Sequence, residues 1–410
     1  MDRRARFSWA LYDWGNSAFA TTVMAGFFPV FFKEYWASDL AATDSTFWLG
    51  VGNSAASTLM VLFAPLIGAL ADQGGSKKRY LLLFAFLGAL MTSSLFLVAA
   101  GMWPVALLLY ALGIVGFSGS IVPYDALLVD VADDAELDRV SALGYALGYL
   151  GGGLLFALNV FMVLRPEFFG MENAGQAVRV SFLMVGVWWA MFSLPLLLFV
   201  HERNPRPANK QVLRGALKEI RDNLREVRRY RMVALFLLAY WLYIDGVDTI
   251  VRMAVDYGLA IGFEASDLLA ALLVTQFVGF PAALLFGRIG ERYGPKRGIM
   301  IALLIYVLIV FWAWRMGDAW EFYALAVVIG LVQGGVQSLS RSLYARLIPQ
   351  DRAGVFYGVY NMLGKFAAVI GPLLVGWVAA LSGDSRLGIL AVLLLFVAGF
   401  MVLQRVTVEE

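Results

Sequence analysis

The sequence predicts an all-α integral membrane protein whose twelve transmembrane helices form two pseudo-symmetric six-helix bundles. Of its 410 residues, 61% are hydrophobic and only 15% are charged, and the mean hydropathy of +0.75 lies outside the usual composition of soluble domains. Twelve windows are apolar enough to cross a membrane, and one short motif recurs at the same place in each half. These observations exclude an ordinary soluble fold.

A helix needs about 20 mainly apolar residues to cross the hydrocarbon core of a bilayer. The first qualifying window follows basic residues but is long and has no small-residue cleavage site, so we expect a retained helix and not a signal peptide. We expect the twelve helices near residues 9–36, 47–71, 80–100, 104–129, 139–164, 180–200, 232–260, 266–288, 297–316, 320–345, 354–380 and 385–403.

The longest connection, residues 201–231, divides the chain into an N-terminal bundle, 1–200, and a C-terminal bundle, 232–410. After Pro207 this connection carries an apolar stripe opposite many basic residues, which predicts an amphipathic helix. We expect it to lie on the anionic inner leaflet of the membrane, and a partner-binding site is the alternative.

Lysine and arginine orient the helices, because short cytoplasmic connections carry an excess of both. They gather before the first helix and in every second connection. The alternate connections hold only Lys33, Arg165, Arg179, Arg315 and Arg386. We therefore expect a multi-pass protein of the cytoplasmic (inner) membrane with both termini in the cytoplasm.

The composition also excludes several kinds of chemistry. No cysteine is present, which excludes disulfides, thiolate nucleophiles and Cys-ligated zinc. The single histidine, His201, borders the charged central connection, where a solvated residue is favoured over a proton relay. The formal net charge is only +2, so we expect no nucleic-acid partner; we also expect no metal and no cofactor. Any proton chemistry must use carboxylates.

An internal repeat connects the two halves. The segment GALADQGGSKKR, residues 68–79, corresponds to GRIGERYGPKRG, residues 287–298, at a constant offset. Glycines permit a tight turn, the carboxylate can pair with a base or a helix N-terminus, and the bases hold the turn at the inner surface. The matched positions, which we expect to control conformation, are Gly68 and Gly287, Asp72 and Glu291, and Gly75 and Gly294, followed by Lys77 and Lys78 in one half and Lys296 and Arg297 in the other.

These paired segments resemble the loop signature of the major facilitator superfamily, and the resemblance covers the whole chain. Five further segments resemble the "unknown major facilitator" branch, which groups with the fungal vacuolar amino-acid effluxers of the autophagy pathway. These segments are LYDWGNSAFATTV, SALGYALGYLGGG, AYWLYIDGVDTI, QSLSRSLYARLIP and YNMLGKFAAVIGPLLVG. The resemblance implies a secondary transporter in which two halves rock around a cavity lined by helices 1, 4, 7 and 10. LLYALGIVGFSGS in helix 4 lacks the arginine of many proton-driven drug exporters, and the resemblance implies no particular substrate.

Helix 7 carries charges that must avoid lipid, because an ionised group facing lipid costs at least about 2.5 kcal/mol. At about 100° per residue, Asp245, Asp248, Arg252 and Asp256 fall within an arc of about 80°, together with Trp241. This stripe predicts that helix 7 faces the central cavity; Arg252 and Asp256 belong to the cavity or to an outer gate, depending on where helix 7 enters the membrane.

Other helices carry polar stripes of the same kind. Two readings remain open. In the first reading, Arg341 with Asp125, and Arg252 with a neighbouring acid, form ion pairs that hold or gate the two halves. In the second reading, a carboxylate near the midplane, Asp245 or Asp248, takes up a proton or binds a substrate amine. The further candidates are Asp13 and Asn16 in helix 1, Tyr124 and Asp125 in helix 4, and Gln333, Gln337 and Arg341 in helix 10.

Helices 5 and 11 are rich in glycine, which indicates close helix packing or a hinge. Lys365 follows Gly364 in helix 11 and imitates a nucleotide-binding loop, but Val359 stands where that loop needs glycine. We therefore group Lys365 with the conformational residues.

The sequence thus predicts a secondary active transporter of a small polar organic solute that works by alternating access. Coupling to protons through membrane-embedded carboxylates is expected, amino-acid efflux follows from the resemblance, and we expect a monomer in the lipid bilayer. The alternatives are a non-transporting membrane sensor or scaffold and an integral membrane enzyme. The sequence contains no HExxH motif and no set of nucleophile, base and acid, so it does not favour an enzyme.

Overall fold

The computed structural model describes residues 3–73, 76–203, 225, 227–260, 265–382 and 384–407, and within these ranges it contains helices and no strand. The first span is composite and runs through α1 (Arg3–Ala18), η1 (Phe19–Phe27), α2 (Phe28–Phe31) and η2 (Phe32–Trp36). The other long helices are α3 (Ala42–Gln73), α4 (Lys77–Ser94), α5 (Trp103–Ala126), α7 (Leu137–Leu164), α8 (Ala174–Phe199), α10 (Arg231–Ala260), α11 (Ala265–Tyr293), α12 (Pro295–Arg315), α13 (Ala319–Leu347) and α14 (Ala353–Ser382), followed by α15 (Ser385–Leu390) and α16 (Leu393–Gln404).

Eleven of these segments are long and apolar enough to cross a membrane when the described residues alone are considered. The helix α14, with 30 residues, occupies the place of the remaining expected span. Within the first span, the wider π-helical turns of η1 and η2 flank Pro29. Proline has no backbone N–H to donate, and its ring clashes with the preceding turn of an ordinary α-helix.

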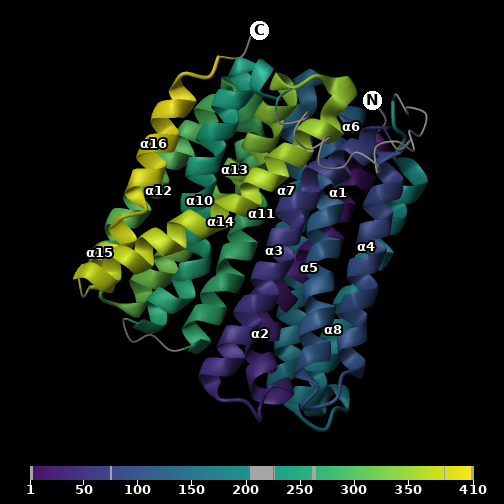
Figure 1. Cartoon of the computed structure of the whole chain (residues 1–410), viewed down its shortest axis with the longest axis vertical. Helices are drawn as coiled ribbons and strands as arrows, with labels where there is room; N and C mark the ends of the chain where they lie inside the picture. Colours follow the sequence, from purple (N-terminus) through teal and green to yellow (C-terminus); the bar gives the residue numbers. More distant parts are fainter. Residues whose placement is uncertain are drawn as a thin grey trace.

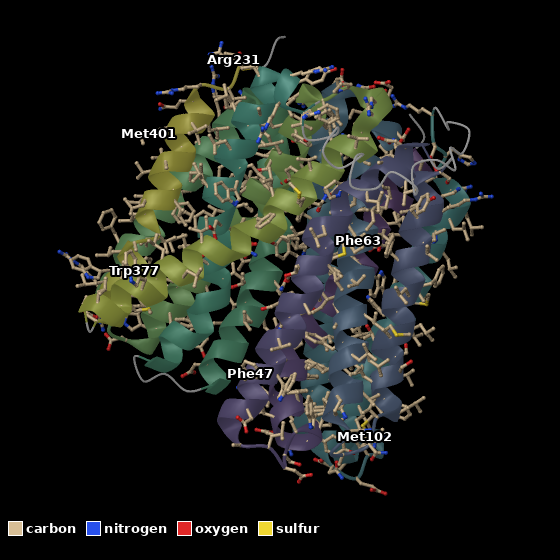
Figure 2. All side chains as sticks on the ribbon, viewed as in Figure 1. Phe47, Phe63, Met102, Arg231, Trp377 and Met401 are labelled. Carbon is tan, nitrogen blue, oxygen red and sulfur yellow. The ribbon has the colours of Figure 1, made fainter. Side chains whose placement is uncertain are left out.

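Helices α1 to α8 lie beside helices α10 to α16, and both chain ends lie at the same end of the molecule (Figure 1). We call this end the termini side. Large apolar side chains cover the flanks: Trp377 and Leu394 are each 67% exposed, and Figure 2 shows Trp377 and Met401 on the outer flank. Such a surface suits lipid and would cause a soluble protein to aggregate.

Small residues let the helices of the N-terminal half approach closely. A Cβ atom added to Gly116 in α5 would lie 2.5 Å from both the N and Cα atoms of Gly88 in α4, so the two backbones touch there. Gly50 in α3, by contrast, has nothing within 4 Å of an added Cβ atom.

We expect Gly116→Ala to lower the melting temperature of the detergent-purified protein, because overpacking a tight contact costs about 1–3 kcal/mol. Gly50→Ala is the matched control and should leave the melting temperature close to that of the wild type. Equal melting temperatures for the two variants would show that α4 and α5 are not in contact as described.

Candidate functional site

A cavity of about 340 Å³ lies between the two halves. Its wall carries two acids and two bases from four different helices. The polar and charged side chains that line it are Asp13, Asn16, Ser17, Thr21, Asp125, Tyr145, Tyr149, Gln276, Gln333, Gln337, Arg341, Asn361 and Lys365. The mixed charge suits a polar or zwitterionic molecule better than an apolar one.

The termini-side end of this cavity is closed by a cross-half ion cluster, which we call the ionic floor: Asp13, Asp125, Ser141, Arg341 and Asn361. Arg341 Nη1 lies 3.1 Å from Asp125 Oδ1 and 3.8 Å from Asp13 Oδ2. Arg341 Nε donates to Ser141 Oγ at 3.0 Å, and Nη2 donates to the Ser141 carbonyl oxygen at 2.8 Å. Asn361 Nδ2 donates to Asp125 Oδ2 at 3.0 Å. Side chains of both halves therefore meet in one network.

Aromatic rings surround the guanidinium group of Arg341, which is 2% exposed. Its Cζ atom lies 4.4 Å from the ring centre of Tyr145, 4.9 Å from that of Trp9 and 5.4 Å from that of Tyr124. The Tyr124 hydroxyl also donates to Asp13 Oδ2 at 3.0 Å. Cation–π contacts and charged hydrogen bonds together compensate for the lost hydration of a buried arginine.

Beyond the floor, toward the termini, Asp72 connects the halves. Its Oδ1 accepts a hydrogen bond from the Gly354 N–H at 2.9 Å, and its Oδ2 accepts one from the Val355 N–H at 2.8 Å. Both donors belong to the first turn of α14, where unpaired N–H groups and the helix dipole favour a negative charge. Gly68 makes this approach feasible, since a Cβ atom there would lie 2.0 Å from the Gly354 carbonyl oxygen.

A second contact between the halves is centred on Asp138 and joins α7 to α13; we call this contact and the Asp72 contact the two seals. Asp138 Oδ1 accepts from Ser342 Oγ at 2.5 Å, and its Oδ2 accepts from Arg346 Nη2 at 2.6 Å. Gly287 packs here against the other half, because an added Cβ atom would lie 2.6 Å from Ala142 Cβ. The first glycine of each repeated motif thus sits where its helix touches the opposite half.

The motif lysines hold helix ends within each half. Lys78 Nζ donates to two carbonyl oxygens at the end of α8, at 3.0 Å each, and Lys296 Nζ donates to two at the end of α16, at 2.8 and 2.7 Å. A cation suits the negative end of a helix dipole. Lys77 forms an ion pair with Asp130 at 2.8 Å.

The two motifs are not equivalent in their acids. Asp72 is buried against α14, whereas Glu291 is exposed, as is Arg297. Gly294 has φ of +85° and makes the tight turn between α11 and α12, a backbone conformation that glycine adopts without strain. Gly75 lies outside the described residues.

Helix α10 differs from the expectation that its charged stripe faces the cavity: none of the described residues that line the cavity belongs to it. Asp245, 1% exposed, accepts from the Gly371 N–H of α14 at 2.9 and 3.1 Å, and Thr249 faces the same glycine. Asp245 and Thr249 therefore turn toward α14. Asp248 and Trp241 are partly buried, and the side chains of two further members lie outside the described residues, Arg252 and Asp256.

Several residues of the cavity and of the ionic floor were not singled out from the sequence. Asn361 carries a signal in the sequence, because it is a polar side chain inside an apolar span. Ser141 and Tyr145 lie in the glycine-rich helix that we interpreted only through its glycines. Lys365, which we group with the conformational residues, also lines the cavity.

Comparison with known proteins agrees with this architecture. A family model described as "Vacuole effluxer Atg22 like" matches residues 42–410. The uncharacterized MFS-type transporter YxiO of Bacillus subtilis is 36% identical over 404 residues, which cover 98% of this chain and 94% of that protein. Autophagy-related protein 22 of Yarrowia lipolytica is 28% identical over 269 residues, which cover 58% of this chain and 45% of that protein.

Among solved structures, the human organic anion transporter MFSD10 superposes with a TM-score of 0.77 at 17% identity, over 98% of this chain and 99% of that one. This likeness confirms the predicted all-α membrane fold, and the family match confirms the resemblance drawn from the motifs. The chain belongs to the Atg22-like vacuole effluxer family and is a transporter of the major facilitator superfamily, not an enzyme.

Proposed function

We propose that this protein moves a small polar organic solute across the cytoplasmic membrane by proton-coupled alternating access, with both termini in the cytoplasm. Amino-acid efflux is the activity that its kinship suggests. The observation that carries the proposal is a cavity of mixed charge between two halves whose contacts near the termini are hydrogen bonds and ion pairs. The site is complete within one chain, so we propose a monomer.

The seals on the termini side are of a kind that can open. Asp72 with the α14 N-terminus, Asp138 with Arg346, and the ionic floor all join the two halves by polar contacts that water can replace. Exchange of such contacts for hydration lets two rigid bundles rock about a central site, as in other transporters with repeated halves. The structure then represents the state closed toward the cytoplasm.

Asp13 is the carboxylate best placed to couple this motion to protons. It lines the cavity, and it lies farther from Arg341 than Asp125 does, 3.8 Å against 3.1 Å. Protonation of Asp13 removes one of the two negative charges near Arg341 and so weakens the connection between the halves. The other titratable groups near it are Tyr12 on its own helix, Tyr124 and Asp125 of α5, and Tyr145 and Tyr149 of α7.

The first test concerns the Asp72 seal. The chain has no cysteine, so Ser338→Cys places a unique thiol at a fully buried position beside the ionic floor. Adding Asp72→Asn should raise the rate of alkylation by a polar maleimide about tenfold or more, because hydrogen bonds to a charged group contribute about 1.5–3 kcal/mol. The detergent-purified protein is suitable for this measurement.

The matched control for this test is Glu291→Gln, the corresponding acid of the second motif. It is exposed, so we expect its alkylation rate to equal that of the Ser338→Cys parent. If Asp72→Asn leaves the rate unchanged, or if both variants raise it equally, Asp72 does not hold the cytoplasmic side closed.

The second test concerns coupling. In proteoliposomes with an imposed pH gradient, Asp13→Asn should abolish accumulation of a mixture of labelled L-amino acids against a gradient, while exchange of the same mixture at equal concentrations persists. Asp245→Asn should keep gradient-driven accumulation and lower the melting temperature, because Asp245 bonds α14 inside one half. If Asp13→Asn accumulates the amino acids as the wild type does and Asp248→Asn does not, the coupling carboxylate belongs to α10 and not to α1.

A further inference from the structure

An aromatic side chain of the N-terminal half enters the C-terminal half at the wall of the cavity. Helix α7 packs against α11 and α13 there, and Tyr149 of α7 lies between Gly279 of α11 and Gly334 of α13 (Figure 1). A Cβ atom added to Gly279 would lie 3.0 Å from both Cγ and Cδ1 of the Tyr149 ring, and one added to Gly334 would lie 2.7 Å from Cε2. We call the space between these two glycines the Tyr149 slot.

Only glycine leaves room for the ring on both sides of this slot. An aromatic ring is rigid, so it cannot bend away from a methyl group as the end of a long flexible side chain can. Small residues at helix interfaces in membranes generally serve to let a neighbour approach closely. Here the neighbour is a side chain of the other half, so the slot connects the halves by shape.

The slot lies near the middle of all three helices. Tyr149 is the 13th of 28 residues in α7, Gly279 is the 15th of 29 in α11, and Gly334 is the 16th of 29 in α13. Along α7, Tyr149 lies eight residues beyond Ser141 of the ionic floor, which is about 12 Å farther from the termini. When two bundles tilt against each other, contacts at the middle of the helices move least and contacts at their ends move most.

The slot also differs chemically from the two seals. Asp72 and Asp138 hold the opposite half by hydrogen bonds and an ion pair, which water can replace. The Tyr149 slot is a contact between ring carbons and helix backbones, and an aromatic side chain buries about 150–250 Å². Water does not compensate for the loss of apolar contact. The termini side can therefore open while the ring stays in its slot.

We infer that Tyr149, held between Gly279 and Gly334, is the positioning residue about which the two halves tilt, and that this contact persists when the termini side opens. The inference rests on the proposed alternating access and assigns its pivot to one side chain. Rigid-body rotation of packed units needs such a contact, because without one the units separate as readily as they rotate.

The test follows both ends of the molecule at once with pairs of spin labels. The chain has no cysteine, so Arg79→Cys with Arg405→Cys labels the termini side, and Met102→Cys with Gly317→Cys labels the far side; all four positions are exposed, and Figure 2 shows Met102 at the far end. Distances within each pair are measured by double electron–electron resonance in the detergent-purified full chain. Adding Asp72→Asn should lengthen the termini-side distance and shorten the far-side distance.

Variants of the slot then decide whether Tyr149 is the pivot. With Tyr149→Ala, Asp72→Asn should still lengthen the termini-side distance, but the far-side shortening should be lost, because nothing holds the middle of the halves together. Tyr149→Phe keeps the ring and should keep the opposite changes. Phe161→Ala, the matched control, removes an aromatic ring of the same helix that is 44% exposed, and it should also keep them.

A second variant approaches the slot from the other half, so the test does not depend on the folding of Tyr149→Ala. Gly334→Ala places a methyl group against the ring and should likewise abolish the far-side shortening. Its control is Gly376→Ala in α14, where an added Cβ atom has nothing within 4 Å, and this variant should behave as its parent does.

The outcomes separate the inference from the proposal on which it rests. If Asp72→Asn fails to produce opposite changes in the parent proteins, the rocking of the two halves is refuted, and the pivot with it. If the parents show opposite changes and these persist in Tyr149→Ala or in Gly334→Ala, rocking stands and the pivot is refuted. In that case Tyr149 only packs, and a lower melting temperature is the sole effect of removing its ring.

Discussion

The structure depends on keeping one arginine charged inside a membrane protein. Arg341 belongs to α13, but its hydrogen-bond acceptors and its aromatic neighbours come from α1, α5 and α7 of the opposite half. Removing one partner of a buried pair leaves an uncompensated charge and costs about 3–5 kcal/mol. The two halves therefore cannot separate at this depth without hydrating the arginine or changing the charge of its acids.

Around this arginine the duplicated motif has diverged in use. The first glycine of each copy touches the opposite half, and a lysine from each copy holds the last helix of its own half. The acids differ: Asp72 binds the exposed N–H groups of α14, while Glu291 faces solvent and Asp138, outside the motif, makes the second seal. The two copies therefore share the turn and the helix packing, whereas the acid that bonds to the opposite half differs: Asp72 lies in the first copy, and Asp138 lies outside the motif.

Much of the candidate site could be anticipated from charge and spacing. Asp13, Asn16, Asp125, Gln333, Gln337 and Arg341 were named because polar stripes in apolar helices must face protein or water, and all of them line the cavity. Asp245 obeys the same rule in a different way, since it faces the backbone of α14. An angular stripe gives the side of a helix that avoids lipid, but it does not distinguish a cavity from a neighbouring helix.

The sequence by itself determined the membrane class, the spans, the duplication and the family, because hydropathy, period and motif are local properties that a single chain displays directly. Only the tertiary structure decided which charges meet. The approach of Asp13 to Arg341, the capping of α14 by Asp72 and the place of Lys365 in the cavity join residues far apart in the chain. Such contacts follow from the rotation and depth of packed helices, which depend on side-chain fit across the whole bundle.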